Sequence, residues 1–132
     1  MSLFKNSFET VDVFSAEADA VITCADSLEF TRSLPDRFAR LVLSSPPYNI
    51  GKAYERQVPI DQYLAEMQPL LGELVRVLAN DGSLCWQVGN HVDDGEIYPL
   101  DVFFYQRLKA LGLQLRNRLV WHFDHGLHAT NR

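Results

Sequence analysis

A segment of helical length lies between two short apolar segments, and this order limits the folds that the chain can adopt. Apolar side chains recur every three or four residues between Pro59 and Leu78, which predicts an amphipathic helix. The segments on either side, Arg40–Ser44 and Ser83–Gly89, are short and apolar, as expected of buried strands. A strand, a helix and a second strand in this order predict parallel neighbours in one sheet. We therefore expect an α/β fold, with a mostly parallel sheet and flanking helices.

Residues typical of caps and turns predict where the other elements begin and end. Arg40–Ser44 is too apolar for a half-exposed strand, so we expect it at the centre of the sheet. Asp61 stands where the long helix needs an N-cap, and Asn80–Gly82 are typical of its end. Residues 1–19 are weakly patterned and are expected to be peripheral. The other expected features are a strand at Ala20–Cys24, a break at Leu34–Asp36, a helix at Leu100–Leu111 closed by Gly112, and a strand at Leu115–Phe123.

The chain has the size of one domain. Its 132 residues, 47% of them hydrophobic, are enough for one core but not for two. The N-terminus does not resemble a signal peptide, and no apolar run is long enough to span a membrane. Cys24 and Cys85 lie far apart without metal-type spacing, which favours buried, reduced thiols and a cytoplasmic protein.

Charge is distributed unevenly along the chain. Of the net charge of −5, Val102–Arg132 contributes +4, from five basic residues and one acid, and the first 101 residues contribute −9. A basic final third could contact phosphates. An ordinary solvated helix accounts for the same residues equally well.

The tetrad Ser45-Pro46-Pro47-Tyr48 directly follows the first predicted strand of this unit. Two prolines fix two φ angles and remove two backbone donors, which leaves a stiff turn that presents carbonyl oxygens. The serine adds a hydroxyl acceptor, and the tyrosine adds a flat aromatic face. These groups suit a flat heterocycle that carries an exocyclic amine. The alternative is a proline turn whose tyrosine only packs.

With its surroundings, the tetrad resembles the catalytic tetrapeptide of the DNA amino-methyltransferases, which is Asp, Asn or Ser followed by Pro-Pro and Tyr or Phe. The similarity extends from about Cys24 to Arg132. Segments that resemble the family are Ala25–Leu28 before the tetrad, Val77–Ser83 at the helix end, and Arg116–His122 with Gly126–His128 near the C-terminus. The resemblance implies a Rossmann-like methyltransferase fold, of which residues 20–132 would form the catalytic half in a single partial domain.

The resemblance also implies a reaction. S-adenosylmethionine would donate a methyl group to the exocyclic amine of a base flipped out of double-stranded DNA. Ser45 Oγ and the Pro46 carbonyl would accept hydrogen bonds from that amine, and Pro47 would stiffen the turn. Tyr48 would stack on the base through its ring, with no role for its hydroxyl. A serine in the first position favours N4 of cytosine over N6 of adenine by this resemblance.

One part of the family pattern is missing from the chain. The glycines never form the GxG of the loop that approaches the cofactor. The order of motifs matches members in which the catalytic half comes first, so we expect a truncated chain, or a split enzyme whose second chain supplies the loop. Asp26 could contact the adenine edge of the cofactor or simply cap the next helix. A half-sheet would expose apolar surface, so self-association is also consistent with the sequence.

Other interpretations of the chain remain open. His122, His125 and His128 have regular spacing, but such spacing aligns metal ligands only on a helix, so we expect no metal site. His91 could contact DNA, although a solvated loop is the simpler expectation. The whole chain could be a non-catalytic DNA-binding or assembly module that retains the half-fold. A similar tetrad, usually led by Asn, serves methylation of glutamine or RNA amines, but Ser45 favours DNA.

Overall fold

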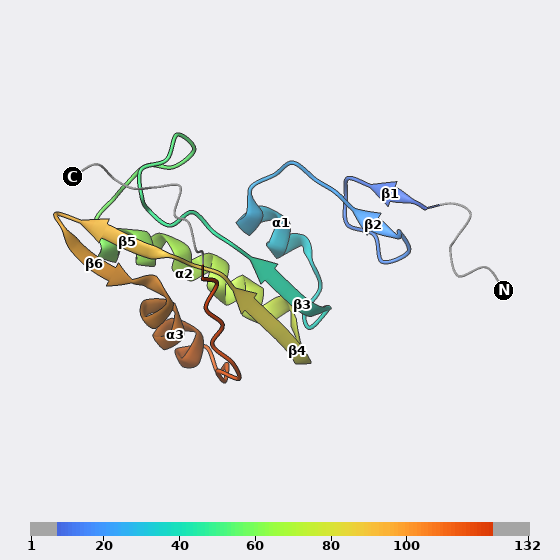
Figure 1. The fold of residues 1–132 in the computed structure, drawn as a ribbon. Coiled ribbons are helices and arrows are strands. Elements are labelled where there is room, and N and C mark those ends of the chain that lie inside the picture. The colour runs from blue at the N-terminus through green and yellow to red at the C-terminus, as the bar shows by residue number, and fades with distance from the viewer. Residues whose placement is uncertain (1–7, 123–132) are drawn as a thin grey trace.

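The computed structural model describes residues 8–122 (Figure 1). Strands and helices alternate over most of this length, so the predicted mixture of helix and strand is confirmed. In chain order the elements are β1 (Thr10–Val11), β2 (Ala20–Val21), α1 (Ser27–Ser33), β3 (Ala39–Ser44), α2 (Ile60–Val77), β4 (Leu78–Trp86), β5 (Asn90–Asp93), β6 (Glu96–Pro99) and α3 (Leu100–Ala110).

The predicted strand–helix–strand unit is present as β3–α2–β4. The strands β3 and β4 are parallel, with Leu43 opposite Cys85 and Ser44 opposite Trp86. Because α2 carries the chain back to the start of the sheet, both strands end at the same edge. This edge bears the tetrad.

Both predicted caps of the long helix are wrong. The N-cap of α2 is Pro59, and Asp61 lies in the first turn, where its charge still favours the helix dipole. The helix ends at Val77, and Asn80–Gly82 belong to β4. There the register is irregular, because the step from Ala39 to Leu41 faces the longer step from Leu78 to Ser83. Residues that suit a helix end thus occupy a bulge in a strand.

The core lies between the helices and one face of β4. Its buried members, drawn from α2 and α3, are Tyr63, Leu64, Leu71, Leu100 and Phe104, and Trp86 and Val88 pack against them from the end of β4. The rings of Trp86 and Phe104 meet edge to face, with centroids 5.4 Å apart.

The expected central position of β3 is not found. Within the described part of the chain β3 pairs with β4 alone. Leu41 and Leu43 on its outer face are 63% and 72% exposed. The apolar composition of this strand therefore does not correspond to burial on both faces.

A β-hairpin formed by β5 and β6 was not predicted. Its two turn residues, Asp94 and Gly95, both have positive φ angles, of 45° and 80°. An Asp-Gly pair is a strong sequence signal for a tight two-residue hairpin turn. Each of the two strands that flank the turn is four residues long.

The helix predicted at Leu100–Leu111 is confirmed as α3, and Gly112 follows it with a φ of +93°. The strand predicted at Leu115–Phe123 is wrong over the described residues 115–122, which are irregular. Leu119 and Val120 there are more than 80% exposed. Alternating apolar residues form a strand only when a neighbouring strand offers hydrogen bonds, and no described strand pairs with this segment.

The N-terminal part is tied to the rest through α1. The short strands β1 and β2 form a separate parallel pair at one end of the molecule (Figure 1). Arg76 of α2 donates to the carbonyl oxygens of Thr31 and Leu34 at the end of α1, so the two helices are joined. None of the helices in residues 8–122 is both long and apolar enough to cross a membrane.

Candidate functional site

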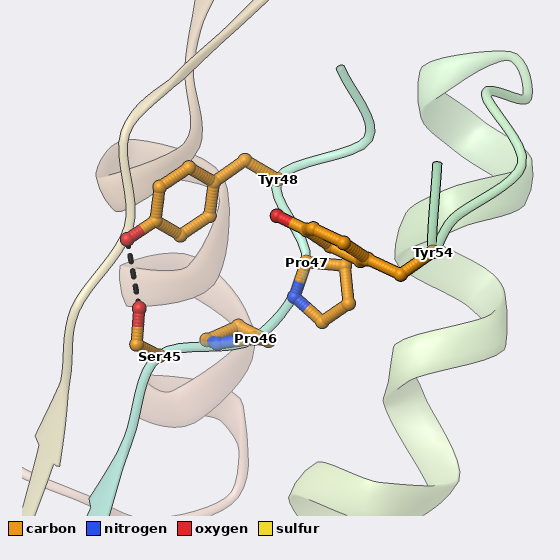
Figure 2. A pocket seen from close by; sticks show the side chains of 5 residues that line it. All are labelled: Ser45, Pro46, Pro47, Tyr48 and Tyr54. Atoms are coloured by element: carbon orange, nitrogen blue, oxygen red, sulfur yellow. Dashed lines mark hydrogen bonds between the residues drawn. The ribbon is translucent and has the colours of Figure 1, made fainter. Parts of the chain in front are cut away.

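The predicted site residues lie together at the carboxyl end of β3. Ser45, Pro46, Pro47 and Tyr48 line a pocket of about 270 Å³, with Tyr54 from the following loop on its other side (Figure 2). Pockets for small molecules usually measure about 300–1,000 Å³. The volume of this pocket lies just below that range.

The hydroxyl groups of the first and last residues of the tetrad form a hydrogen bond with each other. Ser45 Oγ and Tyr48 Oη lie 2.8 Å apart, drawn as the dashed line in Figure 2. Ser45 is exposed and Tyr48 is half-buried. The tetrad thus closes into a small loop that presents polar atoms to the pocket.

The two proline carbonyls of the tetrad have different environments. Tyr63 of α2 donates its hydroxyl hydrogen to the Pro47 carbonyl, at 2.6 Å. Among the described residues, no hydrogen bond reaches the carbonyl of Pro46, which is a buried residue, so of the two carbonyls this one retains its capacity to accept. Burial raises the pKa of Tyr63 to about 12, and Glu55 and Tyr48 add to the rise. Tyr63 therefore remains a neutral donor across the physiological range, and it holds the turn.

The Tyr48 ring lies close to the backbone of Gly89. A Cβ atom at Gly89 would lie 3.1 Å from Cδ2 and 3.3 Å from Cε2 of that ring. Contacts this short would force the ring to move. The absence of a side chain at Gly89 thus leaves the space that the Tyr48 ring occupies beside the end of β3.

The loop after the tetrad is folded around two side chains. The Glu55 carboxylate accepts hydrogen bonds from the backbone N–H groups of Asn49, Ile50 and Lys52. The Asn49 amide donates to the Val58 carbonyl and accepts from the Val58 N–H, at 2.7 and 2.8 Å. Asn49 is 1% exposed and has a φ of +60°, a conformation that asparagine tolerates better than most residues. The backbone that carries Tyr54 is therefore fixed by its neighbours.

Tyr54 was not predicted as a site residue. Its side chain is 75% exposed and extends toward the tetrad from the loop before α2 (Figure 2). An exposed aromatic residue beside a proline turn was the available signal. The supporting residues Tyr63, Glu55 and Gly89 carried no signal of their own, because their roles depend on contacts across the fold.

His91 lies neither in a solvated loop nor at a surface that DNA could contact, the two alternatives that the sequence offered. The side chain is fully buried, so the solvated loop is wrong, and it offers no surface for DNA. Its Nδ1 lies 2.8 Å from the Asn49 carbonyl oxygen, which implies a proton on that nitrogen. Its Nε2 is buried with no partner among the described residues. His91 therefore supports the loop after the tetrad from β5.

Asp26 caps α1. Its Oδ1 accepts hydrogen bonds from the N–H groups of Leu28 and Glu29, at 3.0 and 3.1 Å. The capping role considered for this residue is confirmed. No hydrogen bond is present at Oδ2 within residues 8–122, so this oxygen is open to a further partner.

The described residues contain no cluster of three or more His, Cys, Asp or Glu side chains arranged for a metal ion. His125 and His128 lie outside the described residues, and only His122 of that group lies within them. The expected burial of the cysteines is wrong, because Cys24 and Cys85 are both exposed free thiols.

Comparisons with known proteins agree on one family. A family model described as DNA methylase matches residues 39–132. The Type II methyltransferase M.BglII of Bacillus subtilis is 40% identical over 108 residues, which cover 81% of this chain and 30% of that protein. The Type II methyltransferase M.ScaI of Streptomyces caespitosus is 27% identical over 112 residues, covering 83% and 36%.

A solved structure has a similar fold. The crystal structure of a protein from Thermus thermophilus, described as a candidate DNA modification methylase, aligns with a TM-score of 0.57 and 29% identity. The alignment covers 70% of this chain and 38% of that one. The chain spans about a third of the length of the two curated relatives.

Proposed function

The chain belongs to the DNA methylase family, and from that premise we propose that it forms the target-base half of a DNA amino-methyltransferase. The methyl donor would be S-adenosylmethionine, and the acceptor would be the exocyclic amine of cytosine or adenine. The observation that carries this proposal is that Ser45, Pro46 and Tyr48 line one small pocket, with no described hydrogen bond to the Pro46 carbonyl.

The pocket would act on a base that has left the duplex, because an exocyclic amine inside the stack cannot be reached. Ser45 Oγ and the Pro46 oxygen would accept the two N–H bonds of the amine. Acceptors on both hydrogens favour a pyramidal nitrogen whose lone pair can attack the methyl carbon. Transfer would form an N–C bond at the amine and break the S–C bond of the donor. One amine proton then leaves past the exposed Ser45 to water.

The aromatic residues would replace the stacking that the flipped base has lost. Base–aromatic stacking is worth about 1–3 kcal/mol per base. Tyr48 would supply one face, held against Gly89. Tyr54 would form the opposite wall from its fixed loop. A serine as the first tetrad residue favours N4 of cytosine, by resemblance to the family.

The cofactor would be held mainly by residues that this sequence does not supply, because it has no GxG loop. The β3–α2–β4 unit is consistent with half of a Rossmann-like sheet, to which a cofactor-binding half would add strands. Asp26 Oδ2 suits a hydrogen bond from an amino or hydroxyl group of the cofactor. S-adenosylmethionine supplies an electrophilic methyl group on sulfur.

The experiment uses this chain together with the protein segment or second chain that supplies the cofactor loop. We call this combination the active preparation. Ser45→Ala should lower the single-turnover rate of methyl transfer to DNA by about 10²-fold or more, because one preorganised acceptor is lost. DNA binding should change little. Ser83→Ala, an exposed serine on β4 away from the pocket, is the matched control and should react like the parent.

Equal rates for Ser45→Ala and the parent would show that Ser45 is only a turn residue. If the chain combined with the cofactor loop binds DNA but incorporates no labelled methyl group into it, the chain is a non-catalytic DNA-binding module.

A further inference from the structure

The hydroxyl of Ser45 is held by a single side chain. Tyr48 Oη lies 2.8 Å from Oγ, and no other described residue forms a hydrogen bond with this hydroxyl (Figure 2). An exposed serine on a turn would otherwise change between staggered rotamers. The bond to Tyr48 selects the rotamer in which Oγ faces the pocket.

A serine acceptor has a difficulty that a carboxylate or amide oxygen does not have. Its oxygen carries a proton of its own, and that proton must point away before an N–H group can donate to the same oxygen. Either hydroxyl can donate in the Ser45–Tyr48 hydrogen bond, so Tyr48 Oη is able to accept this proton. Tyr48 is half-buried, so its own hydroxyl hydrogen can turn to water.

We propose that the Tyr48 hydroxyl is a positioning group that accepts the Ser45 proton and leaves the Oγ lone pairs to the target amine. This inference rests on the proposed function, and it gives Tyr48 a second role beside stacking. The sequence alone suggested that only the ring matters, because the contact between the two ends of the tetrad depends on how the turn folds.

The surroundings of Tyr48 keep its hydroxyl in this position. Gly89 supports the face of the ring, and the Tyr63 hydrogen bond holds the Pro47 carbonyl on the preceding residue. The buried Asn49 anchors the backbone on the other side. These contacts favour the position of the ring in which its hydroxyl meets Ser45 Oγ.

A double-mutant cycle in the active preparation tests the proposal. Tyr48→Phe keeps the ring but removes the hydroxyl, and it should lower the single-turnover rate by about fivefold to tenfold, the effect of one hydrogen bond. The position of the methylated base in the DNA is first determined with the parent protein, and 2-aminopurine is then placed there. Binding of this flipped base analogue, measured by its fluorescence, should stay at the parent level. Tyr105→Phe, which removes a hydroxyl on α3 away from the pocket, is the matched control and should change neither value.

The other half of the double-mutant cycle repeats Tyr48→Phe in proteins in which Ser45 is replaced. In a Ser45→Ala background, Tyr48→Phe should cause less than a twofold further loss, because there is no serine proton to accept. In a Ser45→Asn background the loss should also vanish, since an amide oxygen carries no hydrogen. Melting temperatures of all variants show whether folding contributes.

Equal losses from Tyr48→Phe with and without Ser45 would overturn the proposal, because the hydroxyl would then act on the base or on folding. No loss in any background would overturn it as well. The proposed function fails separately, through a Ser45→Ala variant that is as fast as the parent.

Discussion

Three of the four tetrad residues, Ser45, Pro47 and Tyr48, have a close partner, and two of those partners lie elsewhere in the chain. Tyr63 of α2 bonds to Pro47, Gly89 after β4 supports Tyr48, and Tyr48 bonds to Ser45. The residue types of the tetrad suggested acceptors and a ring. Its partners could not be predicted, because each lies at least sixteen residues away or depends on the geometry of the turn.

At this scale, Tyr63→Phe tests the support of the turn. Loss of the hydrogen bond to the Pro47 carbonyl should lower the free energy of unfolding at pH 8 by about 1 kcal/mol. Urea unfolding followed by circular dichroism measures this difference. A variant as stable as the parent would show that the bond adds nothing to folding.

The same variant should change the pH dependence of stability. The pKa of Tyr63 rises from 10.0 to about 12 in the folded chain. Its contribution is therefore complete below pH 10 and is lost as the pH rises through 12. By pH 11 the parent should lose about 1 kcal/mol from this group, and Tyr63→Phe should lack that loss. Parallel curves for the two proteins between pH 8 and pH 11 would contradict the assignment.

Among the elements, those with a long periodic pattern were predicted well and those that depend on pairing were not. α2 and α3 follow from the spacing of apolar residues, and both are present close to their predicted bounds. The strand expected at Leu115–Phe123 has suitable residues, but no described strand pairs with residues 115–122. The hairpin β5–β6 has modest strand signals but a turn that brings its strands together. Strand formation depends on a partner, which a single segment of sequence does not reveal.

The end of β4 offers a test at this scale. Gly89→Ala should push the Tyr48 ring aside by a few tenths of an ångström. We expect the rate of methyl transfer in the active preparation to fall by roughly threefold to tenfold, since small misplacements of reacting groups are costly. The melting temperature should change little. Gly72→Ala in α2 is the matched control, because a Cβ there meets no atom within 4 Å.

The control variant has an expected direction of its own. A glycine inside a helix costs about 0.5–1 kcal/mol relative to alanine, so Gly72→Ala should raise the melting temperature without changing the rate. If both glycine variants slow the reaction equally, the close contact between Gly89 and Tyr48 is not the cause.

For the whole molecule, the basic C-terminal third is partly engaged with the chain itself. Arg118 forms an ion pair with Asp101, and Lys109 lies over the Tyr105 ring. Arg107 donates to the Phe103 carbonyl. The Arg118–Asp101 pair offsets one positive charge, whereas Lys109 and Arg107 keep theirs in contacts with neutral groups.

At this scale we expect the 132-residue chain alone to transfer no methyl group to DNA, because its sequence contains no GxG loop for the cofactor. Incubation with labelled S-adenosylmethionine and DNA of mixed sequence measures the incorporation. The active preparation serves as the positive control. Clear incorporation by the chain alone would show that its own residues bind the donor.

The contact between Trp86 and Phe104 also gives the molecule an optical signal. The chain has two tryptophans, and they lie in opposite surroundings, since the indole nitrogen of Trp86 is buried whereas Trp121 is 71% exposed. Fluorescence from an indole in apolar surroundings is emitted at shorter wavelength than fluorescence from an indole in water. The blue part of the emission spectrum therefore originates where α3 meets β4, and a soluble quencher will reach Trp121 first.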